Sequence, residues 1–258
     1  MSQPHLLMIH GLLGSINYFA PRTYLGALHV HTPDLLGYGD QAGAFTAAAI
    51  DLHLQADTIA QIIRERIGAP TWLLGHSVGG AVAMLVAQRV PELVAGLISV
   101  EGNFTLNDAF LCAKIAATEP GEWEQQYRAM AADPEGFLKR GAIGPNAQRL
   151  DWAKAILANQ SAATVHSMAT SVIHETGAPA YLELVRTVVR RTPMHLLAGE
   201  RSVRDWDVPD WARSSARSSV VIPDTGHMMM LEDPAGFCRT VRDMVEDASV
   251  YGEGGGHA

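Results

Sequence analysis

Short apolar runs alternate along the chain with longer stretches in which apolar positions recur at helical spacing. Most of the runs end in Gly, Pro, Asp or Ser, residues that turn a chain out of a strand. Continuous apolar strands separated by helices are typical of a parallel sheet that is covered on both faces. The pattern therefore predicts an α/β fold with a doubly wound, mostly or wholly parallel sheet of about six strands. The predicted strands occupy residues 6–10, 28–32, 71–74, 93–100, 194–198 and 219–223.

Helices are predicted between and after these strands. Residues 48–67 carry apolar side chains at helical spacing. Residues 78–89 are almost entirely apolar, as expected for a helix buried against a sheet. Residues 233–247 are amphipathic, with one apolar face that is suited to packing on the sheet.

The alternation is interrupted once, because residues 103–192 contain no convincing buried strand. Helical pieces punctuated by Gly and Pro fill this segment instead, and the first of them is expected at residues 106–118. We therefore predict a helical cap at 103–192, inserted into an α/β core formed by 1–102 and 193–251. The tail at 252–258 has too little apolar surface to pack and is expected to be disordered.

The strongest chemical signal is the sequence Gly-His-Ser-Val-Gly at residues 75–79, between a predicted strand and a predicted helix. A sharp strand-to-helix turn of this kind strains the backbone of Ser77 and lifts its hydroxyl above the sheet edge. The amino end of the following helix favours a developing oxyanion, and the amide of Val78 is a candidate donor. Ser77 is therefore predicted to be a nucleophile. The alternative is a tight glycine turn in which Ser77 only caps the helix.

Two further loops carry candidate groups. The first predicted strand runs into His-Gly-Leu-Leu-Gly-Ser at residues 10–15, where the amide of Leu12 could complete an oxyanion hole. Near the end of the chain, His227 follows the strand predicted at 219–223 and is placed to act as general base. His29 and His31 share one strand face but lack a third ligand at a recognisable spacing, so no metal site is predicted.

Together these residues resemble the α/β-hydrolase superfamily, and the resemblance covers the whole chain. The segment Pro-Asp-Leu-Leu-Gly-Tyr-Gly at 33–39 also looks like the D-x-x-G-x-G loop of that family. The resemblance implies a helical cap and a chain that starts at the third strand of the family. The antiparallel first hairpin is therefore expected to be absent, which leaves about six parallel strands.

The acid of the implied triad departs from the family pattern. The family usually places an Asp after the penultimate strand in the pattern G-x-x-D, and this position holds Ser202. Glu101 directly follows the strand predicted at 93–100, and haloalkane dehalogenases of the superfamily keep their acid after that strand. The ends of adjacent parallel strands lie close together, so we assign the acid to Glu101. The alternatives are Asp205, Asp207 and Glu200.

A serine at the elbow determines the expected reaction class. Dehalogenation and epoxide opening in the superfamily need an Asp there, so we expect acyl chemistry with an acyl-enzyme on Ser77. The predicted activity is hydrolysis of a carboxylic ester or thioester of a small, largely apolar substrate. Candidate substrate-binding residues, chosen for apolar bulk with a few polar tips, are Trp123, Tyr127, Trp152, His166 and Met228.

Two other functions stay open. The loop at 10–15 and the absent hairpin resemble the menaquinone-pathway lyases of this fold, and ring-cleaving C–C hydrolases share the cap. Against a lyase, the arginine pairs expected for a polyanionic substrate are not evident near the motifs. The third function is a ligand-binding protein with reduced catalysis, which the serine at position 202 suggests.

The composition limits the classes of molecule that the chain is expected to bind. The 258 residues include 19 Lys and Arg against 27 Asp and Glu, a formal charge of −8 without basic runs, which argues against nucleic-acid binding. No apolar run approaches the roughly 18 residues of a membrane span, and no signal peptide is recognisable. Cys112 and Cys238 are expected to be free thiols. We expect a cytoplasmic monomer or homodimer that acts on a small molecule without a cofactor or metal.

Overall fold

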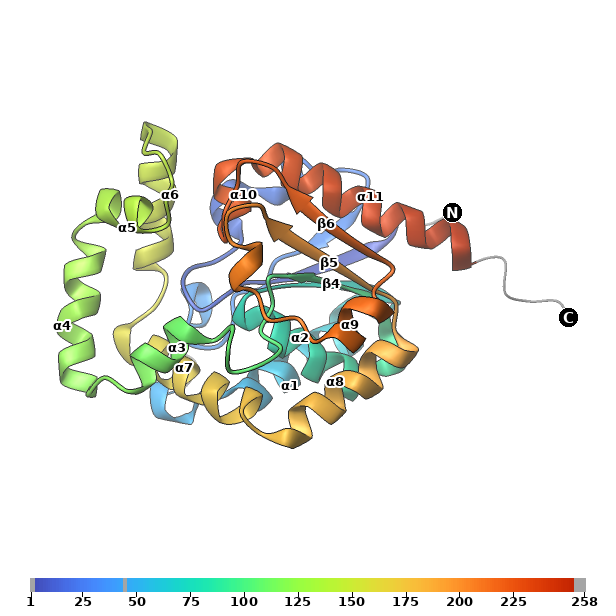
Figure 1. Cartoon of the computed structure of the whole chain (residues 1–258), viewed down its shortest axis with the longest axis horizontal. Helices are drawn as coiled ribbons and strands as arrows, with labels where there is room; N and C mark the ends of the chain where they lie inside the picture. Colours follow the sequence, from blue (N-terminus) through green and yellow to red (C-terminus); the bar gives the residue numbers. More distant parts are fainter. Residues whose placement is uncertain (1–2, 44–45, 253–258) are drawn as a thin grey trace, which may run out of the picture.

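The computed structural model describes residues 3–43 and 46–252, and these residues form an α/β fold around one sheet (Figure 1). The sheet has six strands in the order β2-β1-β3-β4-β5-β6, and all neighbouring pairs are parallel. The strands are β1 His5–Ile9, β2 His29–His31, β3 Thr71–His76, β4 Val94–Val100, β5 Met194–Gly199 and β6 Ser218–Ile222. Each lies where the apolar runs predict a strand, so the predicted fold class is confirmed.

The burial of each strand explains why the apolar runs are a reliable signal. Every residue of β3 and β5 is buried, whereas the edge strand β6 alternates between exposed and partly buried positions. Along β1, Leu7 and Ile9 pack into one apolar cluster, and Leu6 and Met8 pack into a second. Successive side chains of a strand point to opposite faces, so the sheet has apolar layers on both sides.

Helices cover each face of the sheet (Figure 1). One face packs against α1 Leu52–Ile62, α2 Val78–Arg89 and α8 Pro179–Arg191. The other face packs against α11 Pro234–Gly252, through Phe237 and Val241. α11 ends at Gly252, the first residue of the tail predicted at 252–258, and the disorder of this tail stays a prediction. Residues 253–258 lie outside the described part of the chain.

Helices alone connect β4 to β5. They are α3 Phe110–Ala116, α4 Pro120–Ala131, α5 Pro134–Arg140, α6 Ala147–Ala158, α7 Ala162–Thr176 and α8. Figure 1 shows α4, α5 and α6 beside the sheet, while α7 and α8 run along the core helices. α8 packs against α2 and α9 Asp210–Ser215, so the last helix of this connection belongs to the layer that covers the sheet. The cap boundaries at 103–192 stay a prediction.

Local hydrogen bonds decide where these helices begin. The side chains of Asp133, Asn146 and Ser161 accept from backbone amides three residues later and cap α5, α6 and α7. The helix predicted from residue 106 is wrong in its start, since α3 begins only at Phe110. The preceding residues form a turn instead, in which Asp108 Oδ2 accepts from the amide of Phe104 at 2.9 Å.

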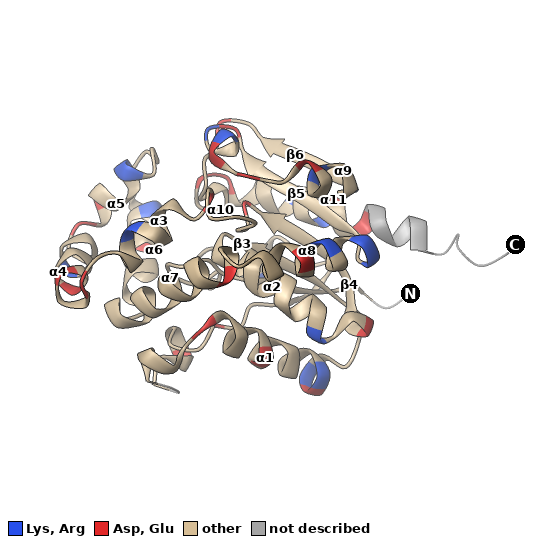
Figure 2. Ribbon diagram, turned by 60° about the horizontal axis from the view of Figure 1, so that its bottom comes forward, with Lys and Arg blue, Asp and Glu red and all other residues tan. Residues whose placement is uncertain are grey.

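Charged residues are interspersed along the surface helices in the view of Figure 2. Several form exposed ion pairs within one helix, such as Lys139 with Glu135 on α5. Such exposed pairs contribute little to stability. Over residues 3–43 and 46–252, no helix combines the length and the apolar character needed to cross a membrane.

Candidate active site

Ser77 lies between β3 and α2 with φ 53° and ψ −123°, a conformation that a non-glycine residue rarely adopts. Its amide donates to the carbonyl of Val100 at 3.0 Å, which fixes the turn against the end of β4. The turn also depends on its two glycines. A Cβ at Gly75 would lie 2.4 Å from the carbonyl oxygen of Gly79, and one at Gly79 would lie 2.4 Å from that of Ile9. A nucleophile elbow requires a strained strand-to-helix turn of this kind with small flanking residues.

Glu101 follows β4 directly, and its side chain is 4% exposed. Oε2 accepts from Nδ1 of His227 at 2.7 Å. Oε1 accepts from the amide of Gly199 at 2.8 Å and from the hydroxyl of Ser202 at 2.6 Å. Burial alone would raise the pKa of Glu101, but these hydrogen bonds and the nearby imidazole outweigh it and lower the pKa from its ordinary value. The carboxylate is therefore ionised at neutral pH.

The other candidate carboxylates have different contacts. Asp207 Oδ2 accepts from Thr105 Oγ1 at 2.6 Å and from Asn107 Nδ2 at 2.9 Å. Glu200 Oε2 accepts from the amide of Asp224 at 3.0 Å. Asp205 lines an open hollow on the surface. Among the four candidates, the hydrogen bond to His227 is made by Glu101.

His227 also contacts His76, the residue before Ser77. The two rings lie 4.6 Å apart between centroids, and His76 Nε2 donates to the backbone oxygen of His227 at 3.0 Å. Burial, followed by the neighbouring His227, lowers the pKa of His76 to about 3, so its ring is neutral at pH 7. Sequence analysis missed this residue. Its position inside the Gly-His-Ser-Val-Gly segment is the signal that could have identified it.

The loop after β1 passes directly beside Ser77, since a Cβ at Gly11 would lie 3.1 Å from the Cβ of Ser77. His10 orients this loop. Its Nδ1 donates to the carbonyl of Gly11 at 2.8 Å, and its Nε2 accepts from the amide of Leu35 at 3.1 Å. Leu12 follows Gly11 in this loop, and Val78 is the first residue of α2. Both stay predicted oxyanion donors.

Four of the five candidate substrate-binding residues lie within the inserted helices, and three of these four bond to backbone carbonyls there. Trp123 Nε1 donates to the carbonyl of Ala162 at 2.9 Å, and Tyr127 Oη donates to that of Leu157 at 2.8 Å. His166 Nε2 donates to the carbonyl of Thr118 at 2.9 Å. Their polar atoms thus bond to the backbone of the inserted segment.

Met228 and Trp152 contact residues of one pocket that His76 also lines. Met228 lines this narrow pocket of about 10 Å³ together with His76, His10 and Tyr18. Trp152 packs on Tyr18, with ring centroids 5.7 Å apart. A role in substrate binding stays a prediction for all five residues. No group of three His, Cys, Asp or Glu suited to a metal ion occurs within residues 3–43 and 46–252.

The site lies where the carboxyl ends of five neighbouring strands meet. Residues 6–240 match the sequence pattern of the α/β hydrolase family. The chain belongs to that family. One α/β hydrolase relative, the 2-succinyl-6-hydroxy-2,4-cyclohexadiene-1-carboxylate synthase of Klebsiella pneumoniae, is 25% identical over 90% of each chain.

Two further similarities bear on the site. Pyrethroid hydrolase of Sphingobium wenxiniae is 33% identical, but the match spans 41% of this chain and only 38% of that enzyme. The structure of a thermophilic esterase from Thermogutta terrifontis superimposes with a TM-score of 0.67 and 21% identity, over 95% of this α/β hydrolase and 90% of the esterase. At that identity the superposition supports the fold, and the reaction has to be argued from the site.

Proposed function

We propose that this α/β hydrolase is a serine hydrolase that cleaves a carboxylic ester or thioester of a small, largely apolar substrate. The hydrogen bond of 2.7 Å between Glu101 Oε2 and His227 Nδ1 carries the proposal. It fixes the imidazole tautomer, because a proton on Nδ1 leaves Nε2 free to accept one. Ser77 in its strained turn supplies the nucleophile.

The proposed reaction has two halves. Ser77 Oγ attacks the substrate carbonyl carbon while His227 Nε2 accepts the hydroxyl proton, and the amides of Leu12 and Val78 bind the oxyanion. His227 then returns this proton to the leaving alcohol or thiol as the bond to the acyl carbon breaks. Water attacks the acyl-enzyme, again losing a proton to His227. The acid is released and Ser77 regains its proton.

A fluorophosphonate probe tests the nucleophile. We expect a single covalent adduct on Ser77, located by mass spectrometry, in the wild-type protein and none in Ser77→Ala. Absence of the adduct in folded wild-type protein would refute the proposal. A series of p-nitrophenyl esters and matched thioesters of increasing acyl length then defines the bond type and the size of the acyl group.

The second candidate is C–C bond cleavage or a lyase reaction on the same triad. The observation that favours it is the similarity to the Klebsiella synthase over 90% of both chains. Arg149 and Arg201, which such a reaction could use to bind an anionic substrate, both donate hydrogen bonds to the protein itself. Turnover of a succinyl-substituted cyclohexadiene carboxylate, without turnover of any ester, would favour this candidate.

A ligand-binding protein with reduced catalysis is the third possibility from sequence. Its motivation was the serine at the usual acid position. Ser202, at that position, donates to Glu101 at 2.6 Å. The serine thus supports a carboxylate that follows the neighbouring strand β4. We further propose that the substrate is a small molecule met in the cytoplasm, that no cofactor is needed, and that the enzyme is a monomer or homodimer.

A further inference from the structure

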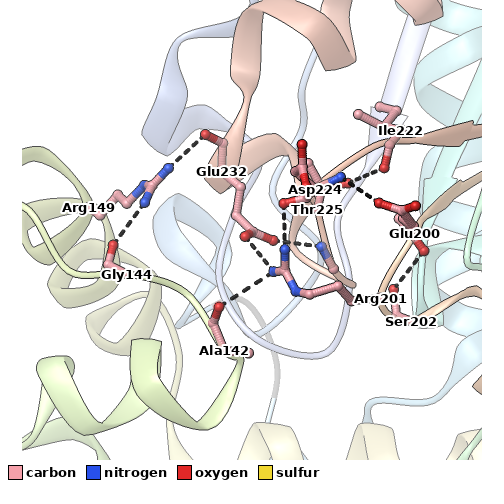
Figure 3. Close-up of polar contacts among 12 residues, drawn as sticks. Ala142, Gly144, Arg149, Glu200, Arg201, Ser202, Ile222, Asp224, Thr225 and Glu232 are labelled. Carbon is pink, nitrogen blue, oxygen red and sulfur yellow. Dashed lines mark hydrogen bonds and ion pairs between the residues drawn. The ribbon is translucent and has the colours of Figure 1, made fainter.

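The three residues directly before His227 each form a hydrogen bond with a neighbouring segment (Figure 3). Asp224 has φ 57°, in the left-handed region, and its amide donates to Glu200 Oε2 at 3.0 Å. The carbonyl of Thr225 accepts from the amide of Arg201 at 2.9 Å. The amide of Gly226 donates to Glu232 Oε1 at 2.7 Å. A strained backbone persists only where its surroundings determine it, so these contacts fix the path of the chain into His227.

Glu232 is the least exposed acidic group in this network, with 9% of its side chain accessible. Both carboxylate oxygens are used. Oε1 accepts from Gly226, and Oε2 accepts from Arg201 Nη2 at 2.5 Å. These two contacts hold the carboxylate in one orientation, because losing Arg201 leaves its charge unpaired and losing the Gly226 amide leaves an oxygen without its donor. Gly226 is the direct neighbour of His227.

Arg201 connects Glu232 to the acid of the triad. Its guanidinium donates to the carbonyl of Asp224 and to Glu232. The next residue, Ser202, donates its hydroxyl to Glu101 Oε1 at 2.6 Å. Two consecutive residues after β5 therefore bind the two sides of the Glu101–His227 pair. Arg201 binds the loop that leads into His227, and Ser202 binds Glu101 itself.

The inserted segment between β4 and β5 also contacts Glu232 and Arg201. Arg149 of α6 donates through Nη2 to the backbone oxygen of Glu232 at 2.8 Å and through Nη1 to the carbonyl of Gly144 at 2.8 Å. Arg201 Nη2 lies 3.5 Å from the carbonyl of Ala142, in the connection between α5 and α6 (Figure 3). Glu232 is thus the meeting point of the His227 loop, the turn after β5 and the inserted helices.

We propose that Glu232 and Arg201 are positioning residues that set His227 against Glu101. The inference rests on the proposed function in that His227 acts there as general base. Neither residue touches the reacting atoms. Their effect is on the orientation of the imidazole, and a misplacement of about 1 Å can cost about 100-fold in rate.

Two substitutions of Glu232 separate its roles. Glu232→Gln keeps an oxygen that accepts from Gly226 but lacks the charge that pairs with Arg201. Glu232→Ala lacks both. We expect kcat to fall by about 10- to 100-fold in Glu232→Ala with KM within about twofold of wild type, and partial rescue in Glu232→Gln. Asp57→Asn, which removes an exposed ion pair with Arg89 on other helices, is the matched control and should leave kcat unchanged.

A second readout does not depend on any substrate. The proton on His227 Nδ1, shared with Glu101, should give a low-field proton NMR signal that is assigned by its loss in Glu101→Gln. We expect this signal to broaden or disappear in Glu232→Ala and to persist in Asp57→Asn. Arg201→Met provides the same comparison if Glu232→Ala does not fold.

The outcomes separate the two proposals. No fluorophosphonate adduct in the wild-type protein would refute the serine hydrolase, while the NMR signal would still report on positioning. Wild-type kcat and an unchanged NMR signal in folded Glu232→Ala would overturn the positioning role. A lower Tm without any change in kcat or in the signal would also overturn it, because Glu232 would then be only structural.

Discussion

At the residue scale, the chemistry of the site depends on which carboxylate reaches His227. Ser202 occupies the position where the family usually keeps its acid, and a hydroxyl cannot stabilise an imidazolium as a carboxylate does. Glu101, at the end of the adjacent strand, bonds to His227 Nδ1 at 2.7 Å and accepts two further hydrogen bonds. Compared with the family pattern, the carboxylate lies at the end of the neighbouring strand. The serine at the usual acid position donates a hydrogen bond to it.

The first prediction concerns this acid. Glu101→Gln keeps the shape of the side chain but removes its charge, so kcat for p-nitrophenyl esters should fall by about 10³- to 10⁴-fold. Asp205→Asn, at an alternative acid position, is the control and should retain wild-type turnover. Near-wild-type rates in Glu101→Gln would show that the assignment of the acid is wrong.

The second prediction concerns the pH dependence of stability. The pKa of Glu101 is lowered from 4.5 in the folded protein, so its contribution to stability is present above pH 4.5 and is lost as the pH falls through the folded pKa. Ser202→Ala removes one hydrogen bond to the charged form and should lower the free energy of unfolding at pH 7 by about 1–3 kcal/mol. The difference from wild type should shrink below pH 4.5.

Urea denaturation at pH 7 and at acidic pH measures this difference. Ser215→Ala is a suitable control, because its hydroxyl donates to the carbonyl of Trp211 one helical turn earlier and faces solvent. A destabilisation by Ser202→Ala that stayed constant across the pH range would argue against a specific interaction with the carboxylate.

At the element scale, the sheet and most helices follow from local pattern. Buried strands such as β3 and β5 are apolar throughout, so their positions are visible in sequence. The start of α3 was not visible, because Asp108 binds the amide of Phe104 and competes with the helix.

The contact of His76 with His227 joins residues 151 positions apart, and no local sequence pattern predicts a contact over such a separation. Trp123 was a substrate candidate by residue type, and its indole nitrogen instead bonds to Ala162.

The third prediction concerns the glycines of the elbow. A Cβ at Gly79 would lie 2.4 Å from the backbone oxygen of Ile9, and strand β1 cannot move away without breaking its pairing. Gly79→Ala should therefore destabilise the protein by about 3 kcal/mol or more, measured by denaturant unfolding. Gly121→Ala in α4, where a Cβ would meet no atom within 4 Å, should be neutral or stabilising. Equal stability of the two variants would contradict the close packing of the elbow.

At the scale of the whole molecule, the site collects groups from five strands that lie side by side. The Gly11 loop follows β1, Ser77 follows β3, Glu101 follows β4, Ser202 follows β5 and His227 follows β6. In a parallel sheet all these ends meet at one edge, which is where open α/β sheets bind their ligands. The topology thus brings together residues that are up to 216 positions apart in the chain, counted from Gly11 to His227 (227 − 11).

The last prediction concerns how the inserted helices are attached to that edge. Arg149 bonds to the backbone oxygen of Glu232, and Trp152 on the same helix packs against Tyr18 beside the narrow pocket. Arg149→Met removes the attachment without altering the Gly226 or Arg201 contacts of Glu232. We expect KM to rise by about 3- to 10-fold with kcat nearly unchanged, since binding and not the triad is affected.

Lys154→Met is the matched control, because Lys154 lies on the same helix and pairs only with the exposed Asp151 in the contacts of the described chain. Its KM should equal that of the wild type. A fall in kcat in Arg149→Met, at unchanged KM, would instead mean that α6 acts on His227 through Glu232. That result would extend the positioning network from the turn after β5 into the inserted helices.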